Sequence, residues 1–135
     1  MSVIVTDEGF VPDDWTGAIT PLDEAGAGST ALDLPNDADP AKLAGRLNGV
    51  EMIRVDFPSA ADGRGFSIAQ RLRLAGYAGR LRARGHVIAD QYAMARRAGF
   101  DEVEISDDLA QRQPEDQWLF RAKWQEHDYQ ARLRG

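Results

Sequence analysis

The sequence predicts an α/β fold: a small parallel sheet of βαβ units, flavodoxin-like or half-barrel-like, with one apolar face, one charged face and a C-terminal helix. The chain has 135 residues and 43% hydrophobic content, which suits one domain over residues 1–135 with its own core. Helical stretches that end in glycine alternate with short apolar runs, which is typical of parallel strands joined by right-handed crossover helices. Charged and apolar residues alternate within these runs, which predicts the two-faced sheet.

The N-terminal part of the chain has the least regular pattern. A short extended region opens it, and residues 16–40 are partly loop-rich because they contain many Gly, Ala, Asp and Pro residues. Within them the run TALDLP, residues 30–35, is expected to form a strand. A helix is predicted over 40–48, with Pro40 in the first turn, where its missing N–H leaves no helical hydrogen bond unmade.

The remaining elements are set by apolar spacing and by glycines. Gly49, Gly76 and Gly99 each stand between a helical stretch and a short alternating run, so a left-handed helix cap is expected at each of them. The helical stretches repeat their apolar residues near the 3.6-residue period. The predicted helices span 66–75, 86–98 and a C-terminal stretch from Pro114, and the predicted strands span 51–57, 80–84 and 102–105.

One face of the predicted sheet is charged, which is unusual for parallel strands because both faces of such a sheet are normally buried. In the strand 51–57, for example, Ile53 and Val55 face one way and Arg54 and Asp56 the other. Three arrangements would explain the charged face: exposure to solvent or to another subunit of a homo-oligomer, closure by the acidic N- and C-terminal segments, or a polar site lining it. If the strand 80–84 lies beside 51–57, Arg82 and Asp56 are placed to pair across the sheet.

The charges are unevenly distributed along the chain. The net charge is −6, which argues against nucleic acid as a partner because phosphate binding needs a basic surface. From Arg64 to Arg97, however, there are eight Arg residues and one acid, Asp90. Acidic flanks folded over this segment would neutralise it, and an alternative is that part of the Arg surplus faces a small oxyanion or an acidic partner.

Several kinds of site are disfavoured by composition. The chain has no Cys, which rules out a disulfide, a thiolate nucleophile and a Cys-ligated metal or iron–sulfur site within it. It has two His and no acids at ligand spacing, so no metal site is expected, and no cofactor signature is evident. The N-terminus lacks the pattern of a signal peptide and no run approaches the length of a membrane span, so a cytoplasmic protein with no membrane contact is expected.

The loop after the strand 51–57 is the first candidate site. It lies where ligands collect in parallel sheets, at a strand carboxyl end that leads into a helix N-terminus. Gly63 and Gly65 would allow close backbone approach or positive φ, Arg64 offers a forked cation, and Ser67 adds a hydroxyl. The alternative is a plain turn in which Asp62 caps the helix 66–75.

The next junction supplies a second candidate. His86 and Asp90 are four residues apart in the predicted helix 86–98, so Asp90 would share a face with His86 and orient it as an acid or base. A surface ion pair is the alternative. The candidate catalytic residues are therefore Asp62, His86 and Asp90.

These segments also resemble a known family. The run DFPSAADGRGFSIAQRLR, the later GYAGRLRARGHVIADQ and RRAGFDEVEI, and the early DEGFVPDDW are similar to the bacterial domain-of-unknown-function family 934. Members of that family are described as uncharacterised, or as candidate oxidoreductases involved in sulfite reduction, because they tend to be encoded beside enzymes of assimilatory sulfate reduction. The resemblance implies a pathway and no specific activity.

The resemblance also points to site residues. A family form with Arg-Arg-Cys-Gly-Phe is Arg96-Arg97-Ala98-Gly99-Phe100 here, so a thiol mechanism does not carry over. The family elements fall on Asp56, Phe57, Pro58, Asp62, Gly63, Arg64, Gly65, Ser67, Arg82, Asp90, Gln91, Gly99 and Phe100.

Two functions are expected from these observations. The first is an accessory or oxyanion-binding protein of assimilatory sulfate or sulfite reduction, with sulfite reductase or another enzyme of the pathway as its partner. The second is a small enzyme, an oxidoreductase acting at the strand carboxyl ends with a borrowed cofactor or partner. A purely structural homo-oligomer that buries the charged face is the third reading.

Overall fold

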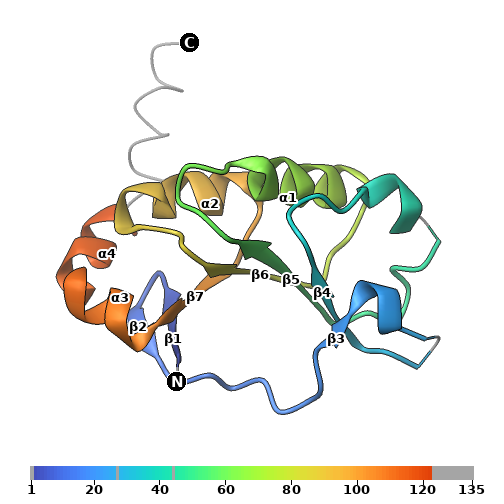
Figure 1. Ribbon diagram of the computed structural model, residues 1–135, viewed down its shortest axis with the longest axis horizontal. Helices are drawn as coiled ribbons and strands as arrows, with labels where there is room; N and C mark the ends of the chain where they lie inside the picture. Colours follow the sequence, from blue (N-terminus) through green and yellow to red (C-terminus); the bar gives the residue numbers. More distant parts are fainter. Residues whose placement is uncertain (1, 27, 44, 123–135) are drawn as a thin grey trace, which may run out of the picture.

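A computed structural model describes residues 2–26, 28–43 and 45–122, and these form one mixed sheet beneath a layer of helices (Figure 1). The strand order is β2-β1-β7-β6-β5-β4-β3. Strands β3 to β7 are parallel, whereas β1 is antiparallel to both β2 and β7. The strands are β1 Ser2–Thr6, β2 Gly9–Val11, β3 Thr20–Pro21, β4 Ala31–Leu34, β5 Met52–Phe57, β6 Arg80–Gly85 and β7 Glu102–Ser106.

The crossover helices α1 and α2 lie on one side of this sheet because the parallel strands that they join follow one another in chain order. Successive crossovers of the same hand then place their helices on the same face. Figure 1 shows α1 and α2 above the sheet, with α3 and α4 beside β7 and β1. This sequential order matches the half-barrel form of the predicted fold. The helices are α1 Arg64–Leu74, α2 Tyr92–Ala98, α3 Asp107–Arg112 and α4 Glu115–Arg121, with 3₁₀ turns η1 Leu22–Glu24, η2 Pro40–Leu43 and η3 Ala89–Gln91.

The apolar face of the sheet packs against α1 and α2 and forms the core. Its strand residues are fully buried, as the alternation predicted. Phe57 at the end of β5 contacts the rings of both Phe66 and Phe100, with centroids 4.9 and 5.8 Å away. Buried members of this core include Leu32, Leu34, Ile53, Val55, Phe57, Phe66, Ala69, Leu72, Leu81, Ala83, Tyr92, Ala95, Phe100, Val103 and Ile105.

Most predicted elements are confirmed, including the left-handed glycines after α1 and α2, whereas Gly49 follows no helix. Gly49, Gly76 and Gly99 all have positive φ, and Gly99 is the left-handed cap of α2. The strands match within one or two residues, and α1 begins at Arg64, two residues before the predicted start. The helix α3 was not predicted. None of the helices in the described part of the chain is long and apolar enough to cross a bilayer.

Two predicted helices are wrong in extent. The helix expected over 40–48 is only the 3₁₀ turn η2, since Gly45 takes a φ of +85°, which is incompatible with a right-handed helix. The helix expected over 86–98 begins later: Ile88 is extended, and η3 and then α2 follow. Burial of Val87 and the β-branched pair Val87-Ile88 favour this extended start.

Gly65 in the first turn of α1 is required by packing. A Cβ added there would overlap the ring of Phe57, whereas a Cβ at Gly63 would be 3.6 Å from its nearest atom, on Phe66. We therefore expect Gly65→Ala to lower the free energy of unfolding by about 1–3 kcal/mol, because the core must shift to make room. Urea denaturation measures this, with Gly63→Ala as the matched control that should change stability much less. Equal effects of the two substitutions would contradict this account.

Candidate functional site

The face of the sheet opposite α1 and α2 carries a network of ion pairs centred on Arg82. We call this surface the charged face. Arg82 is completely buried, its Nε donates to Glu102 at 2.5 Å and its Nη1 donates to Glu104 at 2.9 Å. Arg54 links Glu104 to Asp33 in the same way. The charged face consists of Asp33, Arg54, Asp56, Arg80, Arg82, Arg84, Glu102 and Glu104.

The segment between β2 and β3, residues 12–19, passes across this face, and we call it the strap (Figure 1). Both oxygens of Asp13 accept hydrogen bonds from the Arg82 guanidinium, at 2.9 and 3.1 Å, and Asp14 pairs with Arg80 at 2.5 Å. The hydrogen bond from Arg82 lowers the pKa of Asp13 below its ordinary value. The acidic N-terminal segment thus covers the part of the charged face around Arg80 and Arg82, as one of the three predicted arrangements required. The C-terminal residues 123–135 lie outside the described residues.

Attachment of the strap depends on Asp13. We expect Asp13→Asn to loosen residues 12–19, because an amide accepts only one of the two charge-assisted hydrogen bonds that Arg82 now donates to the carboxylate. Limited proteolysis should then cut the strap several times faster than in the unmodified protein. Asp23→Asn in η1 is the matched control. An unchanged cleavage rate would show that other contacts hold the strap.

Beyond the strap, at the carboxyl ends of the strands, the charged face opens into two adjoining pockets that share Asp56 and Arg84. The first, the β7-side pocket, has a volume of about 620 Å³ and the second, the β4-side pocket, about 820 Å³. The β7-side pocket is lined by Ser2, Asp56, Phe57, Pro58, Arg84, Gly85, His86, Glu104, Ile105, Ser106, Leu109 and Arg112.

Arg84 is the central cation of these pockets, and it is held more loosely than Arg82. Its Nη1 is 3.5 Å from Asp56 and its Nε is 3.5 Å from Glu104, and its side chain is 46% exposed. Glu104 is already neutralised by Arg54 and Arg82. The guanidinium of Arg84 is therefore able to donate hydrogen bonds to a ligand without breaking a short ion pair.

His86 joins Arg84 in the β7-side pocket because the chain turns sharply after β6. Gly85 has a φ of +119°, and a Cβ there would lie 2.5 Å from the carbonyl oxygen of Phe57. The His86 N–H donates to that same carbonyl at 2.8 Å, which fixes the turn and leaves the imidazole exposed. The pocket thus combines a guanidinium and an imidazole with the hydroxyls of Ser2 and Ser106.

In the DGRG loop, residues 62–65, which was expected to bind an anion, the charged side chains bond to one another. The Arg64 guanidinium forms a fork with Asp62, at 3.0 and 2.8 Å, and Asp62 also accepts from the Arg64 N–H and from Asn36. The hydrogen bond from Arg64 holds the pKa of Asp62 below its ordinary value. Neither Gly63 nor Gly65 has positive φ, and Ser67 is exposed on α1. Residues 62–65 and Ser67 line neither of the two pockets.

The other predicted site residues are divided between loops. Gln91 accepts from the Ile88 N–H and donates to the Ala60 carbonyl at 2.8 Å, so it ties the loops after β5 and β6 together. Asp90 pairs with Arg121 of α4 at 2.5 Å. His86 precedes the helix, so the expected helical pair of His86 and Asp90 is not formed, because residues 86–88 are not helical.

The pairing expected between Arg82 and Asp56 is also wrong. The register places Asp56 opposite Arg84 and Arg82 opposite Arg54. Of the predicted site residues, Asp56 and His86 meet in the β7-side pocket, whereas Arg82 is buried. Arg84 was not predicted as a site residue. The alternating run RLRARGH nevertheless places it on the charged face, next to the carboxyl end of its strand.

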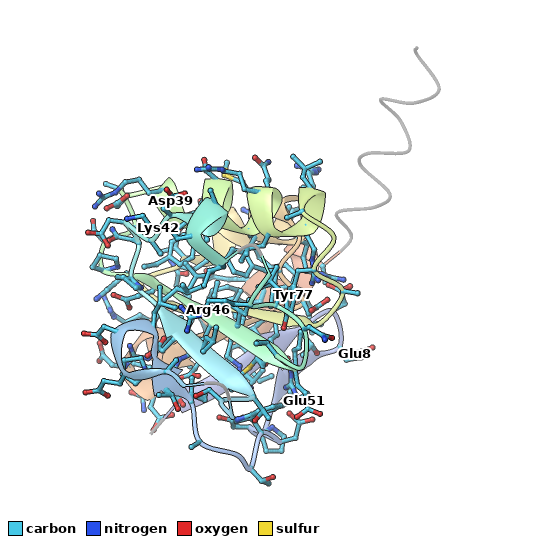
Figure 2. The ribbon with its side chains drawn as sticks, turned by 90° about the vertical axis from the view of Figure 1, so that its right-hand side faces the viewer. Glu8, Asp39, Lys42, Arg46, Glu51 and Tyr77 are labelled. Atoms are coloured by element: carbon cyan, nitrogen blue, oxygen red, sulfur yellow. The ribbon has the colours of Figure 1, made fainter. Side chains whose placement is uncertain are left out.

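The second pocket adds cations from the chain after β4. Lys42 in η2 and Arg46 line the β4-side pocket, and Figure 2 shows both side chains on the β3–β4 side of the molecule. Within the described residues, no group of three or more His, Asp or Glu side chains is placed to hold a metal ion. The two pockets combine Arg, Lys and His side chains and apolar surface with the carboxylates of Asp23, Asp33, Asp56 and Glu104.

Comparison with known proteins identifies the family of this chain. A family model of bacterial proteins of unknown function, DUF934, matches residues 31–135. The chain belongs to the DUF934 family. The DUF934 match begins at the first residue of β4, so it includes Arg84, His86 and all four α-helices and leaves out the strap. No curated protein and no solved structure gives a significant match.

Proposed function

We propose that this protein binds a small oxyanion, sulfite or sulfate, in the β7-side pocket, and that it acts as an accessory protein in assimilatory sulfate or sulfite reduction. The observation that carries the proposal is the pair of long contacts made by the half-exposed Arg84. An oxyanion at the Arg84 fork would gain short charge-assisted hydrogen bonds in exchange for two 3.5 Å ion pairs. Seryl hydroxyls and His86 line the same pocket and add further donors.

The pathway is supported by the resemblance described above, to proteins encoded beside enzymes of assimilatory sulfate reduction. A reductase of that pathway is the proposed partner. Besides its donors, the pocket contains the carboxylates of Asp56 and Glu104, each 3.5 Å from Arg84, and an anion at Arg84 would take the place of these two long contacts.

The binding proposal is tested by thermal unfolding in the presence of sulfite, sulfate and phosphate. An anion that binds the folded state raises the melting temperature. We expect this increase to be lost in Arg84→Gln and kept in Arg64→Gln, because Arg64 is already bound to Asp62. The reverse outcome would place the site in the DGRG loop, and the absence of any increase would refute oxyanion binding.

The pathway proposal is tested in a native host. A deletion strain should grow poorly with sulfate as its only sulfur source and normally with cysteine, and Arg84→Gln should fail to restore growth where Arg64→Gln succeeds. Co-purification of sulfite reductase subunits would support the accessory role. Normal growth of the deletion strain on sulfate would refute the pathway.

One observation favours the alternative of a small enzyme. Among Asp62, His86 and Asp90, His86 alone lines the pocket that contains Arg84. A bound anion at Arg84 would lie beside an exposed imidazole, which is the usual acid or base of proteins near neutral pH. Reduction of sulfite with an added reduced carrier as the electron donor, lost in His86→Gln while anion binding persists, would support this alternative.

A further inference from the structure

The β4-side pocket continues the site on the other side of Arg84. The two pockets share both Asp56 and Arg84, so they adjoin at this ion pair at the carboxyl end of the charged face, and we call the two together the groove. An inorganic sulfate has five atoms and fills only a small part of a groove whose two halves measure about 620 and 820 Å³. The groove is in the size range of sites for small organic molecules.

The two halves of this groove differ in chemistry. The β7-side pocket gathers the donors of Arg84, His86 and Arg112 with two seryl hydroxyls. The β4-side pocket has more apolar surface, supplied mainly by residues in and next to η1, η2 and the end of β4. Its lining also includes the charged side chains of Asp23, Asp33, Lys42 and Arg46. Its apolar lining residues are Pro21, Leu22, Ala25, Leu34, Pro35 and Leu43.

We propose that the ligand is an organic oxyanion, a sulfate ester or sulfonate with a ring-sized apolar body. Its anionic group lies at Arg84 in the β7-side pocket, and its body lies against Leu22 and Ala25 in the β4-side pocket. This inference rests on the proposed oxyanion site and extends it with a specificity surface. Leu22 and Ala25 are partly buried and pack against the core, so they present a formed apolar wall rather than a loose side chain. Burial of an apolar body there adds affinity that an inorganic anion cannot gain.

The groove also suits the polar substituents of such a body. Lys42 and Arg46 are exposed at its edge, and Asp23 adds an acceptor. A few polar groups set among apolar ones are the usual means by which a pocket orients a small organic ligand. Arg84 lies at the junction of the two halves, where the ester or sulfonate group of the ligand would be.

Isothermal titration calorimetry with three probes tests this inference: inorganic sulfate, 4-nitrophenyl sulfate and 4-nitrophenol. We expect 4-nitrophenyl sulfate to bind about tenfold more tightly than sulfate or better, which is about 1.4 kcal/mol, and 4-nitrophenol to bind weakly. Arg84→Gln should weaken both anions. Leu22→Gln should abolish the advantage of the organic anion and leave sulfate binding unchanged.

Controls separate this inference from the oxyanion proposal. Leu74→Gln, on an exposed position of α1, should leave all three affinities unchanged. Ala25→Gln provides a second variant of the same wall if Leu22→Gln does not fold. If the two anions bind equally well and both depend on Arg84, the inference of an organic ligand is wrong and the proposed oxyanion site is supported. If Arg84→Gln leaves the affinity for 4-nitrophenyl sulfate unchanged, the inference is wrong. If neither anion binds, both proposals are wrong.

Discussion

Replacement of Arg82 by Met is expected to lower the free energy of unfolding by about 3–5 kcal/mol, because it leaves a cluster of carboxylates without its central cation. Arg82 is fully buried and donates to Asp13, Glu102 and Glu104. Glu102 and Glu104 are themselves buried and lie on the same face of β7, so the substitution removes a cation that both of them contact. Urea denaturation measures the loss. Arg112→Met, which removes an exposed pair with Asp108, is the matched control and should cost less than about 0.5 kcal/mol.

The pH dependence of unfolding gives this prediction a second readout. The hydrogen bond from Arg82 lowers the folded-state pKa of Asp13 from its ordinary value of 3.8. A carboxyl whose pKa is lowered on folding stabilises the folded state above its unfolded pKa, and this stabilisation is lost as the pH falls through the folded pKa. The difference between the unmodified protein and Arg82→Met should therefore shrink below about pH 4, where the Asp13 carboxyl begins to take up a proton. A difference that stays constant from pH 7 to pH 3 would contradict an electrostatic origin.

The two faces of the sheet could be predicted from the sequence because they depend only on local alternation. In β6, Leu81 and Ala83 face the helices and Arg82 and Arg84 face the other way, as the period of two requires. The pairing across strands depends on register, which loop lengths and tertiary packing decide. That is why Asp56 meets Arg84 in the structure and not Arg82.

The strap illustrates what local reasoning cannot supply. The acidic character of the N-terminal segment was visible, and its role in covering the charged face was one of three predicted arrangements. Which acid meets which Arg was not predictable, since Asp13 and Arg82 are 69 residues apart and only the path of the chain brings them together. The antiparallel pairing of β1 with β7, which starts that path, has no signal in either segment alone.

The sequence contained a reason to expect the cation of the predicted DGRG site to be paired already. Arg64 stands between two glycines and therefore suggested an anion-binding loop, but Asp62 is two residues away and its carboxylate occupies the guanidinium fork. A short acid-to-Arg spacing in a turn is thus evidence that the cation is already paired. Arg84 has no acid close to it in sequence, and its contacts with Asp56 and Glu104 are long.

Oxyanion affinity is expected to change in opposite directions when the two members of the Asp56–Arg84 pair are replaced. Asp56→Asn removes the carboxylate that competes with a ligand for the Arg84 guanidinium, 3.5 Å away. We expect sulfate to bind about two- to fivefold more tightly, which corresponds to the value of an exposed ion pair. Arg84→Gln removes charge-assisted hydrogen bonds to the anion, and it should weaken sulfate binding about tenfold or more.

Calorimetric titration with sulfate at fixed ionic strength measures both effects, because exposed charges are screened by salt. Both side chains are substantially exposed, so neither substitution should change the free energy of unfolding by more than about 0.5 kcal/mol, and a loss of binding cannot be attributed to misfolding. Asp62→Asn is the matched control for the acid, because its carboxylate is paired with Arg64 outside the groove. Tighter binding in Asp56→Asn but not in Asp62→Asn would locate the anion at Arg84. Weaker binding in Asp56→Asn would mean that the carboxylate holds Arg84 in its binding orientation rather than competing for it, and would contradict the prediction.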